Sequence, residues 1–183
     1  WIKRNITPSE HQKIIDLGEI NLEFHSERKR IYPYKNSASH LVGFVNIDHV
    51  GQKGIERSFD QKLSSSMDVT LSIDINLQQS IRHNLLETIN YYKAESGLAI
   101  VMDISNGEIL SSVSYPDFNP NDNSSFNEDN LMNRVIQANY EMGSTFKPLT
   151  VVNGFDYGII DPSMVFDVKK SIKGVKDHDS YKD

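Results

Sequence analysis

The chain has 183 residues, long for one small domain and short for two full ones, and its 38% hydrophobic and 24% charged residues are ordinary for a globular protein. A formal net charge of −6 argues against nucleic acid as the main partner, and the absence of cysteine excludes disulfide frameworks and thiolate metal sites. No apolar run approaches the roughly 18 residues that a membrane helix needs.

The first third of the chain is predicted to mix short helices and strands. Thr7–Glu10 reads Thr-Pro-Ser-Glu, the signature of a capping box with proline at the first helical position, and Gly18 is the expected end of this helix. A half-buried strand is expected next, because apolar residues alternate with polar ones at Ile20, Leu22 and Phe24. Residues 41–47 predict a second strand, and residues 54–63 a short helix.

The middle of the chain contains the strongest local signals. "SSSMD" at residues 64–68 is the best candidate for a linker. Residues 77–92 carry apolar side chains at helical spacing, with Asp74 or Asn76 as the cap. Two β-rich runs joined at Asn106-Gly107 predict a hairpin with a type I′ turn, ended by Pro116. Residues 117–130 are rich in Asn, Asp and Ser and predict a polar surface loop.

A serine and a lysine lie three residues apart at the start of the last predicted helix. Apolar residues at helical spacing follow them, and Gly158 is a plausible end. Pro148 cannot lie deep in a helix, because it lacks an N–H and its ring clashes with the carbonyl of Ser144 four residues earlier. Ser144 is therefore expected at or just before the first turn.

This pair has the residue types that acyl transfer needs. A serine hydroxyl is a poor nucleophile without an adjacent base, and Lys147 lies within reach of Ser144 on the same helix face. The helix N-terminus favours a developing alkoxide and a neutral lysine, and burial of Phe146 against a core would favour the neutral form further. The alternative is that Ser144 only caps the helix.

Several motifs together carry a resemblance to a known family. "YEMGSTFKPLTVV" (140–152) strongly resembles the nucleophile motif of penicillin-binding transpeptidases, usually Tyr-Glu-Pro-Gly-Ser-Thr-Phe-Lys-Pro. "SGLAIVMDISNGEILSSVSYPDFNPND" (96–122) and "NLMNRVIQANYE" (130–141) are similar to the segments that precede it. Residues 30–63 resemble the pedestal domain of class B penicillin-binding proteins, and their short gap between Gly-Phe-Val and Gly-Ile-Glu favours the septal branch.

The resemblance implies an α+β fold in two parts. Residues 1–66 would be the pedestal, the dimerisation-type domain of class B proteins, and residues 67–183 the N-terminal portion of a serine β-lactamase-like transpeptidase domain. Ser144 matches the acylated nucleophile, Lys147 its base, and the Ser144 backbone N–H one oxyanion-hole donor. Glu56 and Arg57 match pedestal positions to which we assign structural roles.

The implied function is that of a peptidoglycan D,D-transpeptidase of cell division, without cofactor or metal. Its partners would be peptidoglycan stem peptides, β-lactams and cell-division membrane proteins, and not nucleic acid. It would lie at the periplasmic face of the bacterial inner membrane, with a membrane anchor upstream of Trp1.

Three departures from the family pattern bear on activity. Met142 replaces the usual proline, and only "SSSMD" stands where a Gly-rich stretch usually joins the two domains. After the nucleophile we find neither Ser-x-Asn nor Lys-Thr-Gly, whose strand supplies the second oxyanion donor in the family. We therefore expect an N-terminal fragment that is inactive alone. The alternative function is a non-catalytic interaction module of the division machinery.

Overall fold

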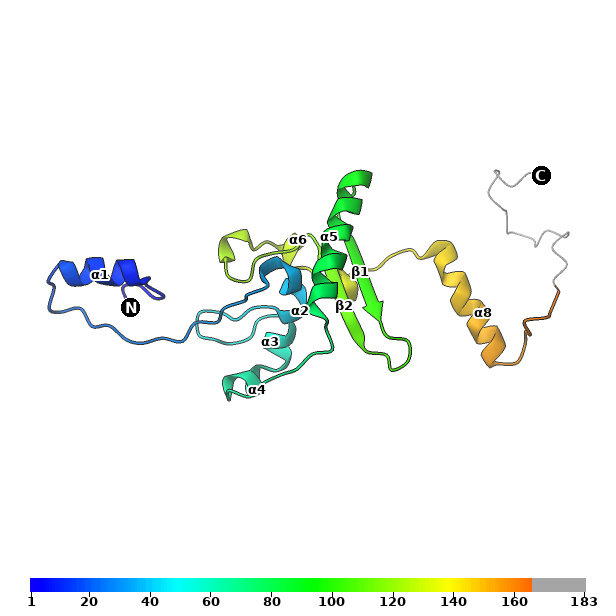
Figure 1. Ribbon diagram of the computed structural model, residues 1–183, viewed down its shortest axis with the longest axis horizontal. Helices are drawn as coiled ribbons and strands as arrows, with labels where there is room; N and C mark the ends of the chain where they lie inside the picture. Colours follow the sequence, from blue (N-terminus) through cyan, green and yellow to red (C-terminus); the bar gives the residue numbers. More distant parts are fainter. Residues whose placement is uncertain (166–183) are drawn as a thin grey trace. The chain divides into compact units, whose positions relative to one another are not determined.

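The structure, a computed structural model, describes residues 1–165, and its elements fall into two units, Trp1–Ala138 and Asn139–Asp183 (Figure 1). The first unit combines one long helix and several short ones with an antiparallel hairpin, and the described part of the second, residues 139–165, holds a turn and one helix. None of the helices within residues 1–165 is both long and apolar enough to cross a lipid bilayer.

The predicted first helix is confirmed as α1, Pro8–Asp16. Thr7 Oγ1 accepts a hydrogen bond from the Glu10 N–H (3.2 Å), and the Glu10 carboxylate accepts one from the Thr7 N–H (2.9 Å). Two of the unpaired donors at the helix start are thereby satisfied, and such a cap stabilises a helix by about 1 kcal/mol. Gly18 follows the end of α1 in the left-handed region, at φ +66°.

The predicted strand around Ile20–Phe24 is wrong. Residues 22–31 are extended, but no strand within residues 1–165 pairs with them. At least one of the alternating apolar side chains packs on a helix instead: Phe24 stacks edge-on against His11 of α1, with ring centroids 4.2 Å apart. A strand requires a ladder partner as well as alternation, and alternation alone does not specify one.

The second predicted strand, at residues 41–47, is also wrong. The chain instead forms the 3-10 helix η1, Lys35–Ala38, and the short helix α2, Ser39–Val42, before an isolated bridge between Val45 and Gly51. Gly43 ends α2 at φ +77°, where an added Cβ would lie 1.8 Å from the Lys53 carbonyl oxygen. This close approach leaves room only for glycine.

The helix predicted at residues 54–63 is split in two. α3 spans Gly54–Ser58 and α4 spans Asp60–Ser64, with Phe59 between them at φ −117° and ψ 23°, outside the helical region. Glu56 of α3 is almost fully buried, and the Arg30 guanidinium holds both of its carboxylate oxygens, Nε to Oε1 at 2.9 Å and Nη2 to Oε2 at 3.0 Å. This bidentate pair supports the structural role expected for Glu56.

The helix and the hairpin predicted for the middle of the chain form the centre of the first unit. α5 spans Ile75–Tyr92, and Asp74 caps it by accepting from the N–H groups of Asn76 (2.9 Å) and Leu77 (3.1 Å). Strands β1, Gly97–Met102, and β2, Ile109–Tyr115, pair antiparallel, and α5 packs against them (Figure 1). The contact is close, since a Cβ added at Gly97 would lie 2.9 Å from Ile89 Cδ1.

The hairpin is confirmed, but its type I′ turn is wrong. Such a turn needs positive φ at both central residues, whereas Gly107 at φ +81° is the only residue between the strands that has it. The loop is longer: the Asp103 N–H bonds to the Glu108 carbonyl (2.9 Å), and Asp103 Oδ1 accepts from the Ser105 N–H (2.8 Å). Asp103 thus organises a local turn that widens the connection. As predicted, β2 ends directly before Pro116.

The expectation of a polar surface loop at residues 117–130 is confirmed only in part: residues 121–124 and 127–129 are exposed, but the segment also contributes to the core. Phe118 is 1% exposed and stacks with Phe44 and Phe126. The Asn121 side chain accepts from the Tyr32 N–H (2.9 Å) and donates to the Tyr32 carbonyl (2.8 Å), as a strand neighbour would. Asn121 thus joins this segment to a distant part of the backbone, whereas Asp122 and Asn127 bond to groups two or three residues away. The short helices η2, Asn123–Ser125, and α6, Glu128–Leu131, begin within this segment, and α7, Arg134–Gln137, follows it.

Within its described residues, 139–165, the second unit contains the 3-10 helix η3, Gly143–Phe146, and the helix α8, Lys147–Asp156. Tyr157 is the C-cap of α8 and Gly158 follows at φ +65°, so the predicted end is confirmed. The chain then folds back, because the Ile159 N–H bonds to the Gly154 carbonyl (2.9 Å).

Candidate functional site

The candidate site begins with a left-handed glycine. Gly143 has φ +53°, and a Cβ added there would have no atom within 4 Å. The glycine is therefore needed for its backbone conformation and not for space. It turns the chain directly before Ser144.

Ser144 lies where Pro148 requires it to be, in the turn just before α8. The Lys147 N–H bonds to the Ser144 carbonyl, closing a 3-10 turn, and Pro148 occupies the first turn of α8. In a 3-10 turn the side chains at positions i and i+3 eclipse one another. The backbone thus brings Ser144 and Lys147 to the same side of the chain.

The polar groups of this turn are open to a ligand. Ser144 and Lys147 are both exposed, and no acceptor for the Ser144 N–H lies within residues 1–165. In the same described range no hydrogen bond joins Ser144 Oγ to Lys147 Nζ. An exposed N–H beside a hydroxyl at the start of a helix can receive a developing oxyanion.

The expected burial of the site by Phe146 is wrong for the described residues. Phe146 is 56% exposed, and none of the residues of η3 and α8 is buried. The apolar face of α8 is therefore uncovered within this unit. The sequence correctly identifies the helix and its apolar face, but not what packs on that face.

The buried polar groups of the first unit serve the fold. Gln78 is 1% exposed, and its amide donates to the carbonyls of Ser37 (2.8 Å) and Ser112 (2.9 Å) while accepting from Ser111 Oγ and the Ser112 N–H (both 2.8 Å). Sequence analysis missed this residue, and its position on the apolar face of α5 was the available signal.

His40 is a half-buried polar group that also serves the fold. Its Nε2 donates to the Asn130 carbonyl at 2.8 Å, and its ring stacks edge-on against Phe118. Burial lowers the pKa of His40 below its usual 6.5, and the hydrogen bond to Asn130, which raises the pKa, offsets this effect only in part. These contacts describe a neutral histidine that joins two segments of the first unit.

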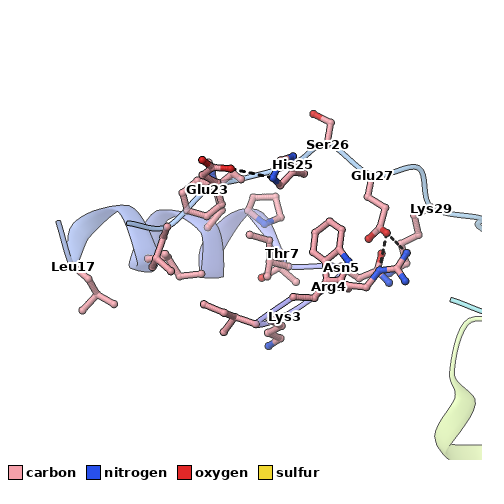
Figure 2. A pocket seen from close by; sticks show the side chains of 18 of the residues that line it. Lys3, Arg4, Asn5, Thr7, Leu17, Glu23, His25, Ser26, Glu27 and Lys29 are labelled. Carbon is pink, nitrogen blue, oxygen red and sulfur yellow. Dashed lines mark hydrogen bonds and ion pairs between the residues drawn. The ribbon is translucent and has the colours of Figure 1, made fainter. Parts of the chain in front are cut away.

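A hollow in the described residues lies away from this turn. It has a volume of about 1130 Å³ and is lined by residues 1–29 alone, so it contains neither Ser144 nor Lys147 (Figure 2). Two of its basic side chains form ion pairs: Arg4 bonds to Glu27, which also lines the hollow, and to Asp48, and Lys3 bonds to Glu10 at 2.5 Å.

Glu10 shows the effect of this pairing most clearly. The bond from Lys3, followed by those from Thr7, lowers the pKa of Glu10 to about 2.

Across residues 1–165, no group of three or more His, Cys, Asp or Glu side chains could hold a metal ion.

Comparison with known proteins places the chain in a family. Residues 97–183 match the penicillin binding protein transpeptidase domain. The chain is 32% identical over 178 residues to a Caulobacter vibrioides protein named probable peptidoglycan D,D-transpeptidase FtsI, covering 94% of this chain and 30% of that protein. It is 30% identical to peptidoglycan D,D-transpeptidase FtsI of Escherichia coli, covering 90% of this chain and 32% of that protein.

A solved structure shows the same likeness in three dimensions. Pseudomonas aeruginosa PBP2, crystallised in complex with WCK 5153, matches with a TM-score of 0.60 and 28% identity over 84% of this chain and 41% of the other. The chain thus spans about a third of the length of the curated relatives. Residues 97–183 therefore belong to the penicillin binding protein transpeptidase family, with its α+β fold, and the chain as a whole is similar to septal D,D-transpeptidases among the class B penicillin-binding proteins.

Proposed function

We propose that this chain is part of a peptidoglycan D,D-transpeptidase of cell division, with Ser144 as nucleophile and Lys147 as its base. The observation that carries the proposal is the turn from Gly143 to Lys147, inside the matched transpeptidase region, which brings hydroxyl and amine to one side at the start of α8. The names of the relatives supply the reaction class.

The reaction follows from the groups at this turn. Ser144 Oγ attacks the carbonyl carbon of the D-Ala-D-Ala bond while its proton passes to Lys147 Nζ, and the Ser144 N–H stabilises the oxyanion. The C–N bond then breaks, the terminal D-Ala leaves with the proton, and an acyl-serine ester remains. An acceptor amine then attacks the ester carbonyl, the C–O bond to Ser144 breaks as the cross-link forms, and a proton from the amine passes through Lys147 Nζ to Ser144 Oγ.

A β-lactam would be trapped by the first half of this sequence. Ser144 Oγ attacks the lactam carbonyl, the ring C–N bond opens, and the leaving amine stays tethered to the acyl group. The stable adduct on Ser144 therefore reports directly on the nucleophile.

The proposed division of the chain is a pedestal at residues 1–66 and a transpeptidase portion from residue 67. Several hydrogen bonds join these two parts, including Asn36 Nδ2 to Asp117 Oδ1 (2.8 Å) and Lys53 Nζ to the Leu131 carbonyl (3.2 Å). Limited proteolysis should therefore cut at residues 64–68 before it cuts within α5, and the two pieces should stay associated in native gel filtration. A first cut inside α5 would contradict this division.

The relatives also guide the proposed setting. An FtsI-type enzyme would act at the periplasmic face of the inner membrane, on peptidoglycan stem peptides, with membrane proteins of cell division as partners. The support for this setting is the likeness to proteins of that name.

The experiment is covalent labelling of the full-length parent with a fluorescent penicillin. Wild type and Ser163→Ala, a control at an exposed serine of the same unit, should label equally, whereas Ser144→Ala should not label. Peptide mass spectrometry should place the adduct on Ser144. An adduct on another serine would overturn the assignment, and a parent that forms no adduct would favour the interaction module.

A further inference from the structure

We infer that Thr145 is a positioning residue, whose hydroxyl holds the peptide plane before Gly143 and thereby aims the N–H and hydroxyl of Ser144. This inference rests on the proposed function of Ser144. It concerns a side chain that has no place in the chemical steps above, although it lies directly beside the nucleophile.

The geometry begins with a carbonyl that accepts two hydrogen bonds. The Met142 carbonyl accepts from the Thr145 N–H (3.1 Å) and also from Thr145 Oγ1. The backbone bond closes the turn, as any residue at this position could do. The second bond requires a side-chain donor such as the threonine hydroxyl, and it holds the same oxygen from a second direction.

The tie acts on the nucleophile through the backbone. The Met142 carbonyl belongs to the peptide plane that enters Gly143, and Gly143 at φ +53° sets the direction of the next plane, which carries the Ser144 N–H. Glycine has the broadest backbone freedom of any residue. A fixed plane on its N-terminal side therefore limits the range of directions available to Ser144.

Other restraints on this turn are few among the described residues. η3 has no side-chain cap, none of its residues is buried, and Phe146 is mostly exposed. Packing therefore does not hold the turn within the described part of the unit, and hydrogen bonds do. An exposed bond of this kind adds little to overall stability, but it can matter for the alignment of a reacting group.

Threonine suits this role better than serine or valine. Its branched Cβ restricts χ1, so the hydroxyl is already directed toward the carbonyl. Serine keeps the hydroxyl with more rotational freedom, whereas valine keeps the shape and loses the donor. The two substitutions separate the hydrogen bond from the shape of the side chain.

The test is the kinetics of acylation of the full-length parent by a chromogenic penicillin, measured over a range of concentrations. Thr145→Val should lower the limiting acylation rate about 10-fold, with the dissociation constant of the first complex unchanged. Thr145→Ser should restore the rate to within about 3-fold of wild type, because it restores the donor. Thr150→Val, the same change at an exposed position of α8, is the matched control and should react as wild type.

The outcomes separate this inference from the proposed function. Persistent labelling of Ser144→Ala would overturn the function of Ser144 itself. If Ser144→Ala is unreactive while Thr145→Val acylates at the wild-type rate, the function stands and the positioning role is wrong. Equal losses in Thr145→Val and Thr145→Ser would also overturn it, since the hydroxyl would then not be the relevant group. Thermal unfolding of each variant shows whether it is folded at the assay temperature. Rates are expressed per mole of acylated protein, so that unfolded material does not lower the measured rate.

Discussion

Single residues at the start of α8 decide what the sequence motif can do. Gly143 supplies the left-handed turn, and a residue with a Cβ would be strained there by about 1–2 kcal/mol. Pro148 fixes the beginning of the helix, and Met142, at φ −69°, has a backbone that proline could also adopt. The replacement of the usual proline by Met142 is therefore compatible with the geometry of the turn.

The role proposed for Lys147 is tested by changing it to arginine. Lys147→Arg in the full-length parent keeps the positive charge but cannot act as a base, because a guanidinium does not lose its proton in proteins. Penicillin acylation should fall by about 100-fold or more, within the range of general-base contributions, while thermal stability stays near that of wild type. Lys13→Arg, an exposed change in α1, is the control. Near-normal labelling of Lys147→Arg would remove Lys147 from the mechanism.

His40 should make the first unit less stable at mildly acid pH. Its pKa in the folded protein is below the usual 6.5, so the unfolded chain binds a proton more readily and stability falls as pH drops through about 6.5. Urea unfolding of the 183-residue chain should show a lower free energy of unfolding at pH about 5.5 than at about 7.5.

The variant His40→Gln isolates this contribution. Glutamine keeps an N–H donor that can serve the Asn130 carbonyl but does not titrate in this range. The loss of stability between the two pH values should therefore be smaller in His40→Gln, and unchanged in His83→Gln, where the histidine is exposed. An identical pH dependence in His40→Gln and wild type would show that this histidine titrates normally.

At the scale of elements, α5 and the loop before it cover one edge of the hairpin. The Asp74 N–H bonds to the Leu110 carbonyl (3.0 Å), Ser72 Oγ bonds to the Ile109 carbonyl (2.7 Å), and the Gln78 amide satisfies both backbone groups of Ser112. The strand order places β2 as the only neighbour of β1 in the described sheet. A two-stranded sheet is marginal alone, so the packing of α5 is needed to hold it.

Removal of the Gln78 amide should therefore weaken the whole first unit. Gln78→Leu keeps the approximate size of the side chain but leaves the partners of four hydrogen bonds unsatisfied in a buried site. We expect a loss of about 2–5 kcal/mol in the free energy of unfolding, measured by chemical denaturation. Gln79→Leu, the same substitution at an exposed neighbour, should change it by less than about 0.5 kcal/mol. Similar losses in both variants would contradict the role of Gln78.

For the molecule as a whole, the uncovered site predicts low reactivity of the 183-residue chain. Its α8 has no buried residue among those described, so Ser144 and Lys147 face water. The family resemblance also places the second oxyanion donor after the nucleophile, beside a Lys-Thr-Gly that is not found here. One such donor contributes a factor of about 10²–10³ to the rate.

Mass spectrometry of this chain and its full-length parent, each incubated with a penicillin, measures the difference. The 183-residue chain should acylate at Ser144 at least about 100-fold more slowly, if the second donor is absent from it. Circular dichroism of the same sample controls for folding through the signal of α5 and the other helices. Equal acylation rates would show that this portion is a self-sufficient site.

The sequence by itself determined the features that depend on neighbours along the chain. The capping box of α1, the cap and length of α5, the hairpin and the position of Ser144 before Pro148 were all predicted and are all present. Each of these features depends on groups a few residues apart, so the residue types and their spacing are enough to predict it. The assignment of Ser144 and Lys147 as a catalytic pair came from the same local motif and remains a prediction.

Tertiary structure decided the features that depend on residues far apart in the chain. Phe118 is buried and Asn121 bonds to Tyr32 although both lie in a segment of polar composition, and the alternating residues around Phe24 pack on α1 without forming a strand. Likewise, the apolar face of α8 is readable from its sequence, but Phe146 is exposed within the described unit. Burial and strand pairing depend on which distant segments of the chain meet. The periodicity of a sequence shows that one face is apolar, but it does not specify the segment that packs on that face.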